Sequence, residues 1–281
     1  RYYHKKNIES LSNNTIWVIK EVNDEEIWIG TSRGLSIYNK RTDRFTNSFY
    51  DPENAQSISS NQVKSIFVSS DGTIWIGTTN GLSKLIGRDK GILSFENFKL
   101  KDDFNKNKKR IGYFDIIEGL NNTILVGTNN AGVLEFDVSK KILKPFFSKE
   151  EQKLVHKNVR KLSFDKDGSL WVGTYDGLYI VSKDRRITHL SHNPNDPNSL
   201  SKNSIKYIFT DKKGSIWVST YYGGVNIWDV SNINFINYTT RNGVSGLNYD
   251  VVSSVETDGE NQMFFGTEGG GINILDKNKK N

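Results

Sequence analysis

Three apolar residues followed by Gly-Thr or, once, Ser-Thr occur six times along this chain. The central position of this segment is aromatic or large and apolar at Trp28, Trp75, Leu125, Trp171, Trp217 and Phe264, so the steps are 47, 50, 46, 46 and 47 residues. A period in the forties with several strands in each unit is typical of β-propeller blades and not of a helical solenoid. The pattern therefore predicts an all-β protein built from repeated blades.

Each repeat has further apolar runs on both sides of this segment. An apolar residue nine positions earlier marks a first strand, at Ile19, Ile66, Ile116, Leu162, Ile208 and Val255. Asp-Gly, Lys-Gly or Asn-containing turns lie between this strand and the central one, and such residues accept the positive φ of a tight hairpin. A Gly shortly after each Gly-Thr or Ser-Thr begins a third strand, and a weaker fourth strand follows in most repeats. Four antiparallel strands make one blade.

The repeats predict six blades in a single β-propeller domain, residues 1–281. The blades span roughly residues 14–50, 61–98, 111–147, 157–191, 203–239 and 250–276. The last repeat ends after its third strand, and residues 1–5 resemble a fourth strand, so we expect the N-terminal strand to close the last blade. The alternative is that the chain is part of a seven-bladed propeller.

The central strand of each repeat is apolar at successive residues instead of alternating, which indicates that both faces of the sheet are covered. Blades packed face to face would supply that cover. We therefore expect the Trp residues to be core side chains and not ligand-stacking rings.

Composition narrows the function classes. The chain has no Cys, which excludes disulfides, thiolate metal sites and Cys nucleophiles. Its net charge of +6 is scattered among 32 acidic residues, so we expect no nucleic-acid partner, and the basic run Lys106–Arg110 is expected to be solvated coil. No apolar run is long enough to cross a bilayer, so we expect no direct membrane insertion by this segment. The chain begins at Arg1 without an initiator Met, and we interpret it as a piece of a longer protein.

The repeat resembles a known family. The pattern Asp-x-x-Gly-x-Ile-Trp-Ile-Gly-Thr-x-x-Gly-Leu-x-x-Tyr, best seen in Ser69–Leu85 and Asp165–Ile180, and the preceding Ser-Leu-Ser-x-Asn, as at Ser199–Asn203, resemble the two-component regulator propeller repeat. This resemblance implies an extracytoplasmic sensor region, on the periplasmic or cell-surface side, of a membrane-anchored bacterial receptor. Such receptors are commonly hybrid histidine kinases that respond to carbohydrates, which implies an oligosaccharide ligand and a homodimer within the receptor.

Two sets of loops converge on one rim of a propeller: those between the second and third strands and those that precede each first strand. The first set differs from blade to blade, as recognition of an asymmetric ligand requires. It supplies tyrosines for stacking on sugar rings and planar hydrogen-bonding groups. The predicted ligand-binding residues are Arg33, Asn80, Asn130, Tyr175, Asp176, Tyr221, Tyr222 and Glu268. In the second set, Asn14, Asn61, Asn203 and Asp250 are equivalent, and we expect them to close Asx-turns more often than to line the rim.

No catalytic constellation stands apart from the repeat. The four histidines, His4, His156, His189 and His192, lack metal-ligand spacing, so we expect no catalytic residues, no metal and no cofactor. The sequence therefore predicts a non-catalytic ligand-sensing domain. A propeller lyase, a glycan-degrading enzyme and a passive protein-interaction scaffold remain as alternatives, because the fold by itself does not decide function.

Overall fold

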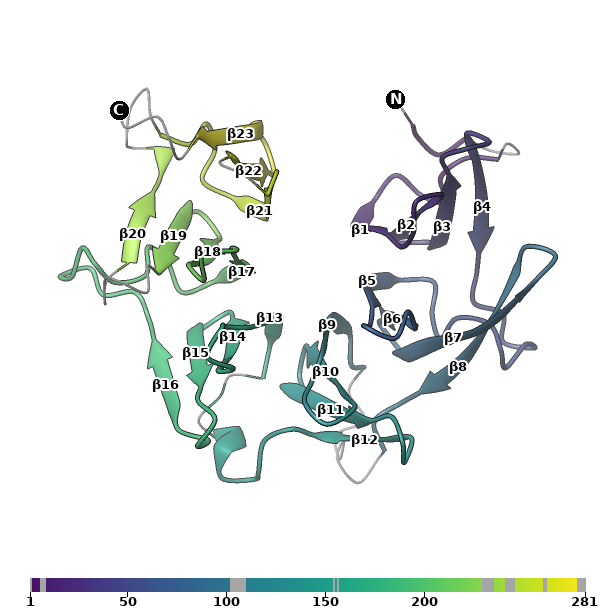
Figure 1. Ribbon diagram of the computed structural model, residues 1–281, viewed down its shortest axis with the longest axis horizontal. Coiled ribbons are helices and arrows are strands. Elements are labelled where there is room, and N and C mark those ends of the chain that lie inside the picture. The colour runs from purple at the N-terminus through teal and green to yellow at the C-terminus, as the bar shows by residue number, and fades with distance from the viewer. Residues whose placement is uncertain are drawn as a thin grey trace. The chain divides into compact units, whose positions relative to one another are not determined.

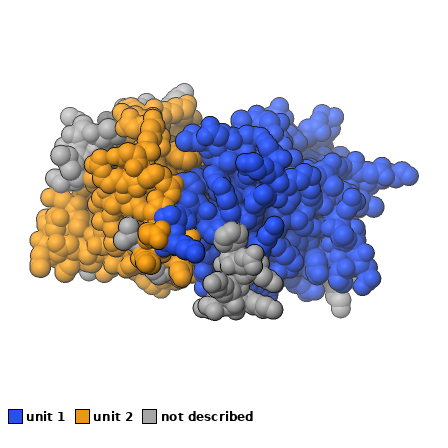
Figure 2. All heavy atoms as spheres, turned by 90° about the horizontal axis from the view of Figure 1, so that it is seen from below, with its two compact units in different colours: residues 1–149 blue, residues 150–281 orange. Residues whose placement is uncertain are grey.

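The computed structural model of the chain describes residues 2–5, 9–101, 110–153, 155, 157–228, 235–240, 246–259 and 262–276. Apart from one short 3-10 helix, η1 (Glu151–Lys153), the regular elements of these residues are β-strands. They fall into two compact units, residues 1–149 and 150–281, which Figure 2 shows in different colours. The prediction of a single domain is not tested by this division.

Unit 1 holds the first three blades (Figure 1). Each is a four-stranded antiparallel sheet whose strands follow one another in chain order. Their bounds are β1 Ile16–Glu21, β2 Glu26–Thr31, β3 Gly34–Asn39 and β4 Arg44–Ser48; β5 Val63–Val68, β6 Ile74–Thr78, β7 Gly81–Asp89 and β8 Ile92–Phe98; β9 Tyr113–Glu118, β10 Thr123–Thr128, β11 Val133–Asp137 and β12 Ile142–Pro145.

Unit 2 holds the next three blades, two of four strands and one of three among the described residues. Their bounds are β13 Val159–Phe164, β14 Leu170–Thr174, β15 Gly177–Val181 and β16 Ile187–Leu190; β17 Ile205–Thr210, β18 Ile216–Thr220, β19 Val225–Trp228 and β20 Phe235–Tyr238; β21 Val252–Thr257, β22 Gln262–Thr267 and β23 Gly271–Asp276. The predicted all-β propeller fold with six blades is confirmed, and the seven-bladed alternative is not favoured.

The Trp residues of the repeat are core side chains, as predicted. Trp28 in β2 is buried with Val63, Ile66 and Ile76 of the next blade, and Trp171 in β14 is likewise buried against the blade that follows it. Within each unit, the first strands of successive blades also contact one another, as β1 does β5 and β13 does β17. Within each unit, a blade therefore covers the exposed sheet face of the blade before it, which explains why the central strands do not alternate.

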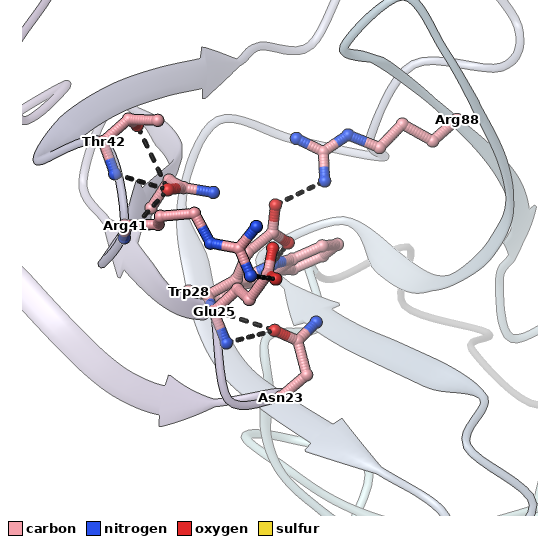
Figure 3. A network of polar contacts seen from close by, with 8 residues as sticks. Asn23, Glu25, Trp28, Arg41, Thr42 and Arg88 are labelled. Atoms are coloured by element: carbon pink, nitrogen blue, oxygen red, sulfur yellow. Dashed lines mark hydrogen bonds and ion pairs between the residues drawn. The ribbon is translucent and has the colours of Figure 1, made fainter.

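The indole N–H groups of these residues are satisfied by carboxylates in three blades. Trp28 Nε1 donates to Glu26 Oε2 at 3.0 Å, while Arg88, from the next blade, forms an ion pair of 2.5 Å with Glu26 Oε1 (Figure 3). Trp171 and Trp217 donate to aspartates that stand six residues before them. Because of these bonds, each indole ring is buried while its N–H donor keeps a hydrogen-bond partner.

A repeated set of buried hydroxyl and amide bonds explains the polar residues of the pattern. The hydroxyls of Ser12 and Thr31 lie 2.8 Å apart, the Ser12 N–H donates to Ser36 Oγ at 2.9 Å, and the Ser36 hydroxyl donates to Asn47 Oδ1 at 2.7 Å. The second blade repeats these bonds with Ser59, Thr78, Ser83 and Asn97. The Gly-Thr threonines and the serines before the first strands of these two blades are therefore framework residues.

The expected Asx-turns at Asn14, Asn61, Asn203 and Asp250 are not formed. Their side-chain oxygens instead accept the backbone N–H groups of His4, Tyr50, His192 and Thr240, ten or eleven residues earlier, at 2.6 to 2.8 Å. The backbone C=O of Asn203 also accepts the N–H of Gly177 in the preceding blade at 2.8 Å. This position joins successive blades because an amide or carboxylate can reach back to the segment that ends the previous blade.

The N-terminal segment differs from the prediction that it forms a strand closing the last blade. Residues 2–5 are not in a strand, and the sheet of β21, β22 and β23 has three strands among the described residues. The Tyr2 ring packs at 5.3 Å from Tyr38 and 5.4 Å from Phe45, and its hydroxyl donates to Asp43 at 2.8 Å. These contacts attach the segment to the first blade.

Candidate functional site

Every first strand has a β-bulge near its start. The register with the second strand shifts at equivalent places in all six blades, for example between Ile16 and Val18 and between Val63 and Ser65. A bulge leaves one residue out of the ladder and changes the direction of its side chain. The bulged residues differ from blade to blade: Trp17, Lys64, Phe114, Arg160, Lys206 and Ser253.

In unit 1, three bulged residues form one cluster. The Lys64 ammonium lies 3.1 Å from the centre of the Trp17 ring and 5.8 Å from that of Phe114. Burial lowers the pKa of Lys64 to about 8, because removing an ammonium from water disfavours its charged form. The Trp17 indole N–H donates to Ser32 Oγ at 2.9 Å, which links this cluster to the loop between β2 and β3.

Ser32 also lines a cavity of about 290 Å³ in unit 1. The cavity is formed by loops between second and third strands and by the segments that precede first strands, the two sets expected from the sequence. Its lining residues are Ser32, Tyr50, Ser59, Ser60, Asn61, Gln62, Asn80 and Arg110.

The side chains of Asn80 and Arg110 in this lining are held by hydrogen bonds. Asn80 Nδ2 donates to the Ser59 C=O at 3.2 Å. Arg110 donates from Nε to the Thr79 C=O at 3.1 Å and from Nη2 to Thr79 Oγ1 at 3.0 Å. The amide and the guanidinium are therefore oriented before any ligand binds, which lowers the entropic cost of binding.

In unit 2, bulged cations contact the tyrosines of the predicted site. The Arg160 guanidinium lies 4.1 Å from the centre of the Tyr175 ring and donates to its hydroxyl. Lys206 forms an ion pair of 2.5 Å with Glu268 and lies 5.2 Å from the Tyr221 ring centre. The cationic side chains hold the rings and the carboxylate in place.

Tyr221, Tyr222 and Glu268 lie in one cluster. The two rings meet edge to face with centres 4.4 Å apart, and Tyr222 is 59% exposed. A hydrogen bond with Tyr222, reinforced by the charge of Glu268, raises the pKa of Tyr221. Tyr222 has a φ of 59°, a left-handed conformation that is rare for an aromatic residue and that often marks functional sites.

The other predicted residues take different places. Asn80 lines the unit 1 cavity. Arg33 and Asp176 are exposed, and their backbone N–H groups donate to the hydroxyls of the threonines two residues earlier. Asn130 has a φ of 71°, which is typical of a turn residue, and its Nδ2 donates to the Arg110 C=O at 3.5 Å. Ligand binding by these residues stays a prediction.

Sequence reasoning missed the bulged residues and Arg110. The signal for the bulges is a position whose residue type differs from blade to blade. It lies eleven residues before the central residue of the repeat and is flanked by two apolar positions, as Lys64 is by Val63 and Ile66. Arg110 was assigned to a solvated basic run, of which residues 106–109 lie outside the described residues. Arg110 precedes the first strand of its blade, as equivalent residues do in the other blades, and this position was the available signal.

The described residues contain no group of three or more His, Asp or Glu side chains arranged to hold a metal ion. Among the same residues, no helix is both long and apolar enough to cross a membrane.

Known proteins resemble this chain in sequence or in fold. A histidine kinase of Formosa agariphila is 42% identical over 189 residues, which are 67% of this chain but only 14% of the kinase. The extracellular domain of a hybrid two-component system from Bacteroides thetaiotaomicron has the same fold, with a TM-score of 0.79 and 24% identity over 98% of this chain and 36% of that one. A virginiamycin B lyase from Staphylococcus aureus shares the fold at a TM-score of 0.58 and 16% identity, over 98% of this chain and 88% of the lyase.

The family model for the two component regulator propeller matches residues 10–33, 57–80, 153–176 and 199–222. The matches that begin at residues 10, 57 and 199 each cover the serine-containing segment before a first strand, that strand and the Trp strand. The two unmatched blades are those in which Leu125 and Phe264 replace Trp. Four of the six repeats of this chain therefore match the two component regulator propeller family, which confirms the resemblance seen in the sequence.

Proposed function

We propose that this chain is a non-catalytic, ligand-sensing extracytoplasmic domain of a bacterial signal-transduction receptor, and that it recognises a carbohydrate through rim loops and bulged residues. One observation carries the proposal. The polar groups that repeat from blade to blade are consumed in framework bonds, whereas the aromatic and charged groups that vary gather in clusters at loops and bulges. An asymmetric ligand needs such variation on a regular scaffold.

The chemistry of the clusters suits a sugar. Tyr175 and Tyr222 are 48% and 59% exposed, so their ring faces are accessible to a pyranose. Glu268 and the hydroxyls and amides of the unit 1 cavity provide hydrogen-bonding groups for sugar hydroxyls.

The relatives support a sensor. One is named a histidine kinase and another is the extracellular domain of a hybrid two-component system, and this chain spans only 14% and 36% of them. The chain would then be one part of a dimeric membrane receptor. Ligand occupancy changes the receptor's output only if the ligand binds its two arrangements unequally.

The lyase alternative is not favoured. Two of the four histidines serve the framework, since Nδ1 of His4 and Nδ1 of His192 each lie 2.7 Å from a Leu backbone oxygen. His189 is stacked on Tyr179 with ring centres 4.2 Å apart, and its Nε2 contacts the Asp176 C=O. His156 lies outside the described residues. These contacts leave the three described histidines poorly placed to act as general bases.

A thermal-shift screen tests the proposal. The chain is melted with neutral and acidic oligosaccharides, and a binding saccharide raises the midpoint. We expect Tyr175→Ala or Tyr222→Ala to weaken that shift, whereas Tyr3→Ala, another exposed tyrosine remote from these clusters in sequence, leaves it unchanged. Flat melting curves with every saccharide would overturn the sensor proposal, and turnover of a glycan would establish the enzyme instead.

A further inference from the structure

The unit 1 cavity has an unusual charge balance. Seven of its eight lining residues are neutral and polar, the eighth is Arg110, and the described lining includes no carboxylate. A site for a neutral sugar commonly pairs carboxylates with hydroxyls, as acceptors of their hydrogen bonds. This cavity instead offers hydroxyls, amides and one fixed cation.

The charge of Arg110 is not neutralised by any residue that the structure describes. Among the described residues, no carboxylate lies within ion-pair distance of its guanidinium. Its two bonds to Thr79 use two of the five N–H donors, and they leave the Nη1 end of the fork for a partner. A guanidinium presents this end in the geometry that matches a carboxylate or a sulfate.

A second cation lies next to this cavity. Lys64 stacks on Trp17, whose indole N–H donates to Ser32 of the lining, and Lys64 follows Gln62 of the lining by two residues. Among the described residues, no carboxylate pairs with Lys64 either. Arg110 in the lining and Lys64 next to it thus place two cations at this cavity, which favours an anion.

The size limits the ligand. A cavity of about 290 Å³ lies at the lower end of the range for small-molecule sites and suits one sugar ring. Resting on the proposed sensing function, we propose that this cavity binds the acidic residue of a saccharide, with Arg110 pairing with its carboxylate or sulfate and with the side-chain amides of Asn61, Gln62 and Asn80 bonding the ring hydroxyls.

Isothermal titration calorimetry of the whole chain with glucuronate, glucose and inorganic sulfate tests this assignment. We expect glucuronate to bind more tightly than either of the others, because only glucuronate offers both the anion and the ring hydroxyls. Arg110→Gln should weaken glucuronate binding by about ten- to hundredfold and leave glucose unchanged, since a charged hydrogen-bonding partner is lost. Arg44→Gln removes the same charge from an exposed site in β4 and should have no effect.

Each contrary result is distinct. Equal affinity for glucose and glucuronate, or an Arg110→Gln variant that binds glucuronate as the wild type does, overturns the acidic assignment and leaves the sensor proposal standing. If inorganic sulfate binds as tightly as glucuronate, the cavity recognises the anion alone, and the proposal that it binds a saccharide is overturned. Absence of glucuronate binding also overturns the inference, while the oligosaccharide screen decides separately whether the chain is a sensor. Far-ultraviolet circular dichroism verifies that both arginine variants are folded.

Discussion

Lys64 is a residue whose environment can be measured directly. Its ammonium lies over the Trp17 ring, and burial lowers its pKa from 10.5 to about 8. Between these values the unfolded chain holds the proton more tightly than the folded chain does. Stability therefore gains from this group as the pH rises from about 8 toward 10.5, and that gain is lost as the pH falls through 8.

We expect the emission of Trp17 to titrate with a midpoint near pH 8, because the charge above its ring changes there. The measurement is the difference in fluorescence between the wild type and Trp17→Phe as a function of pH. In Lys64→Gln the step should disappear. A midpoint near 10.5 would mean that the ring's attraction for the cation outweighs the cost of burial.

Trp75 is the exception among the repeat tryptophans. It is 1% exposed, and its Nε1 has no hydrogen-bond partner among the described residues. In the blade of Trp171, Asp165 Oδ2 accepts the indole N–H at 2.9 Å, but the equivalent residue before Trp75 is Ser69. The Ser69 hydroxyl instead lies 2.6 Å from Asp71 Oδ1 and 3.0 Å from the Thr73 C=O, and donates its one hydrogen to these acceptors. A buried donor without a partner costs stability.

Ser69→Asp should therefore stabilise the protein by about 1 kcal/mol, since it supplies the missing acceptor. Asp165 and Asp167 coexist in the equivalent turn, so Asp71 does not preclude the change. Urea unfolding measures the gain. In a Trp75→Phe background, which has no indole N–H, the same substitution should give no gain, and an equal gain there would show that the effect does not come from this bond.

At the scale of elements, the Gly of Gly-Thr is required by the approach of neighbouring blades. A Cβ at Gly173 in β14 would lie 2.6 Å from Ile205 Cγ2 and 3.1 Å from Ile208 Cδ1, both in β17. The fifth blade has Ser219 at this position, and its hydroxyl donates to the Val252 C=O of the following blade at 2.8 Å. A side chain therefore fits only where it makes a bond across the interface.

Gly173→Ala should destabilise the protein by about 1 to 3 kcal/mol, because it overpacks a well-filled interface between strands. Gly87 in β7 is the matched control: no atom would lie within 4 Å of its Cβ, and it has no positive φ in the left-handed range. Gly87→Ala should leave the midpoint of urea unfolding unchanged or raise it slightly. Equal effects of the two substitutions would contradict the packing argument.

The strands were predictable because each repeat places the same apolar positions and turn residues at the same spacing, so that Ile74–Thr78 and Leu170–Thr174 could be located from the pattern. The bulge was not located from the sequence, because its signal is only an odd spacing: the buried Val63 and Ile66 are three residues apart, whereas residues on one face of an unbroken strand have even spacings. Lys64 and Arg160 therefore looked like ordinary exposed strand residues.

The candidate site was predictable only in part. Loop variation found Asn80 in the cavity and the cluster of Tyr221, Tyr222 and Glu268. The role of Asn203 was missed, because an Asx-turn is local and readable from sequence, whereas a bond to the N–H of His192 depends on how the blade ends. Arg110 was missed for a different reason, because it ends a basic run whose composition is typical of solvated coil.

At the scale of the whole molecule, the buried clusters divide between the two units. Trp28 and Trp75 belong to clusters whose members all lie in residues 1–149, and Trp171 and Trp217 belong to clusters confined to residues 150–281. Each unit thus has three blades and its own core. Repeat proteins need about three stacked repeats to bury a continuous core.

We therefore expect residues 1–149, expressed alone, to fold and to unfold cooperatively in a thermal circular dichroism experiment. Residues 1–100 form the control, because that fragment lacks Tyr113, Ile116 and Val126, against which Trp75 is buried. The shorter fragment should lose cooperativity or melt at a clearly lower temperature, since its second blade has lost the cover of the third. If residues 1–149 are unfolded alone, the chain folds only as a whole, as the prediction of a single domain implies. Cooperative folding of this fragment would instead make unit 1 a folding domain by itself.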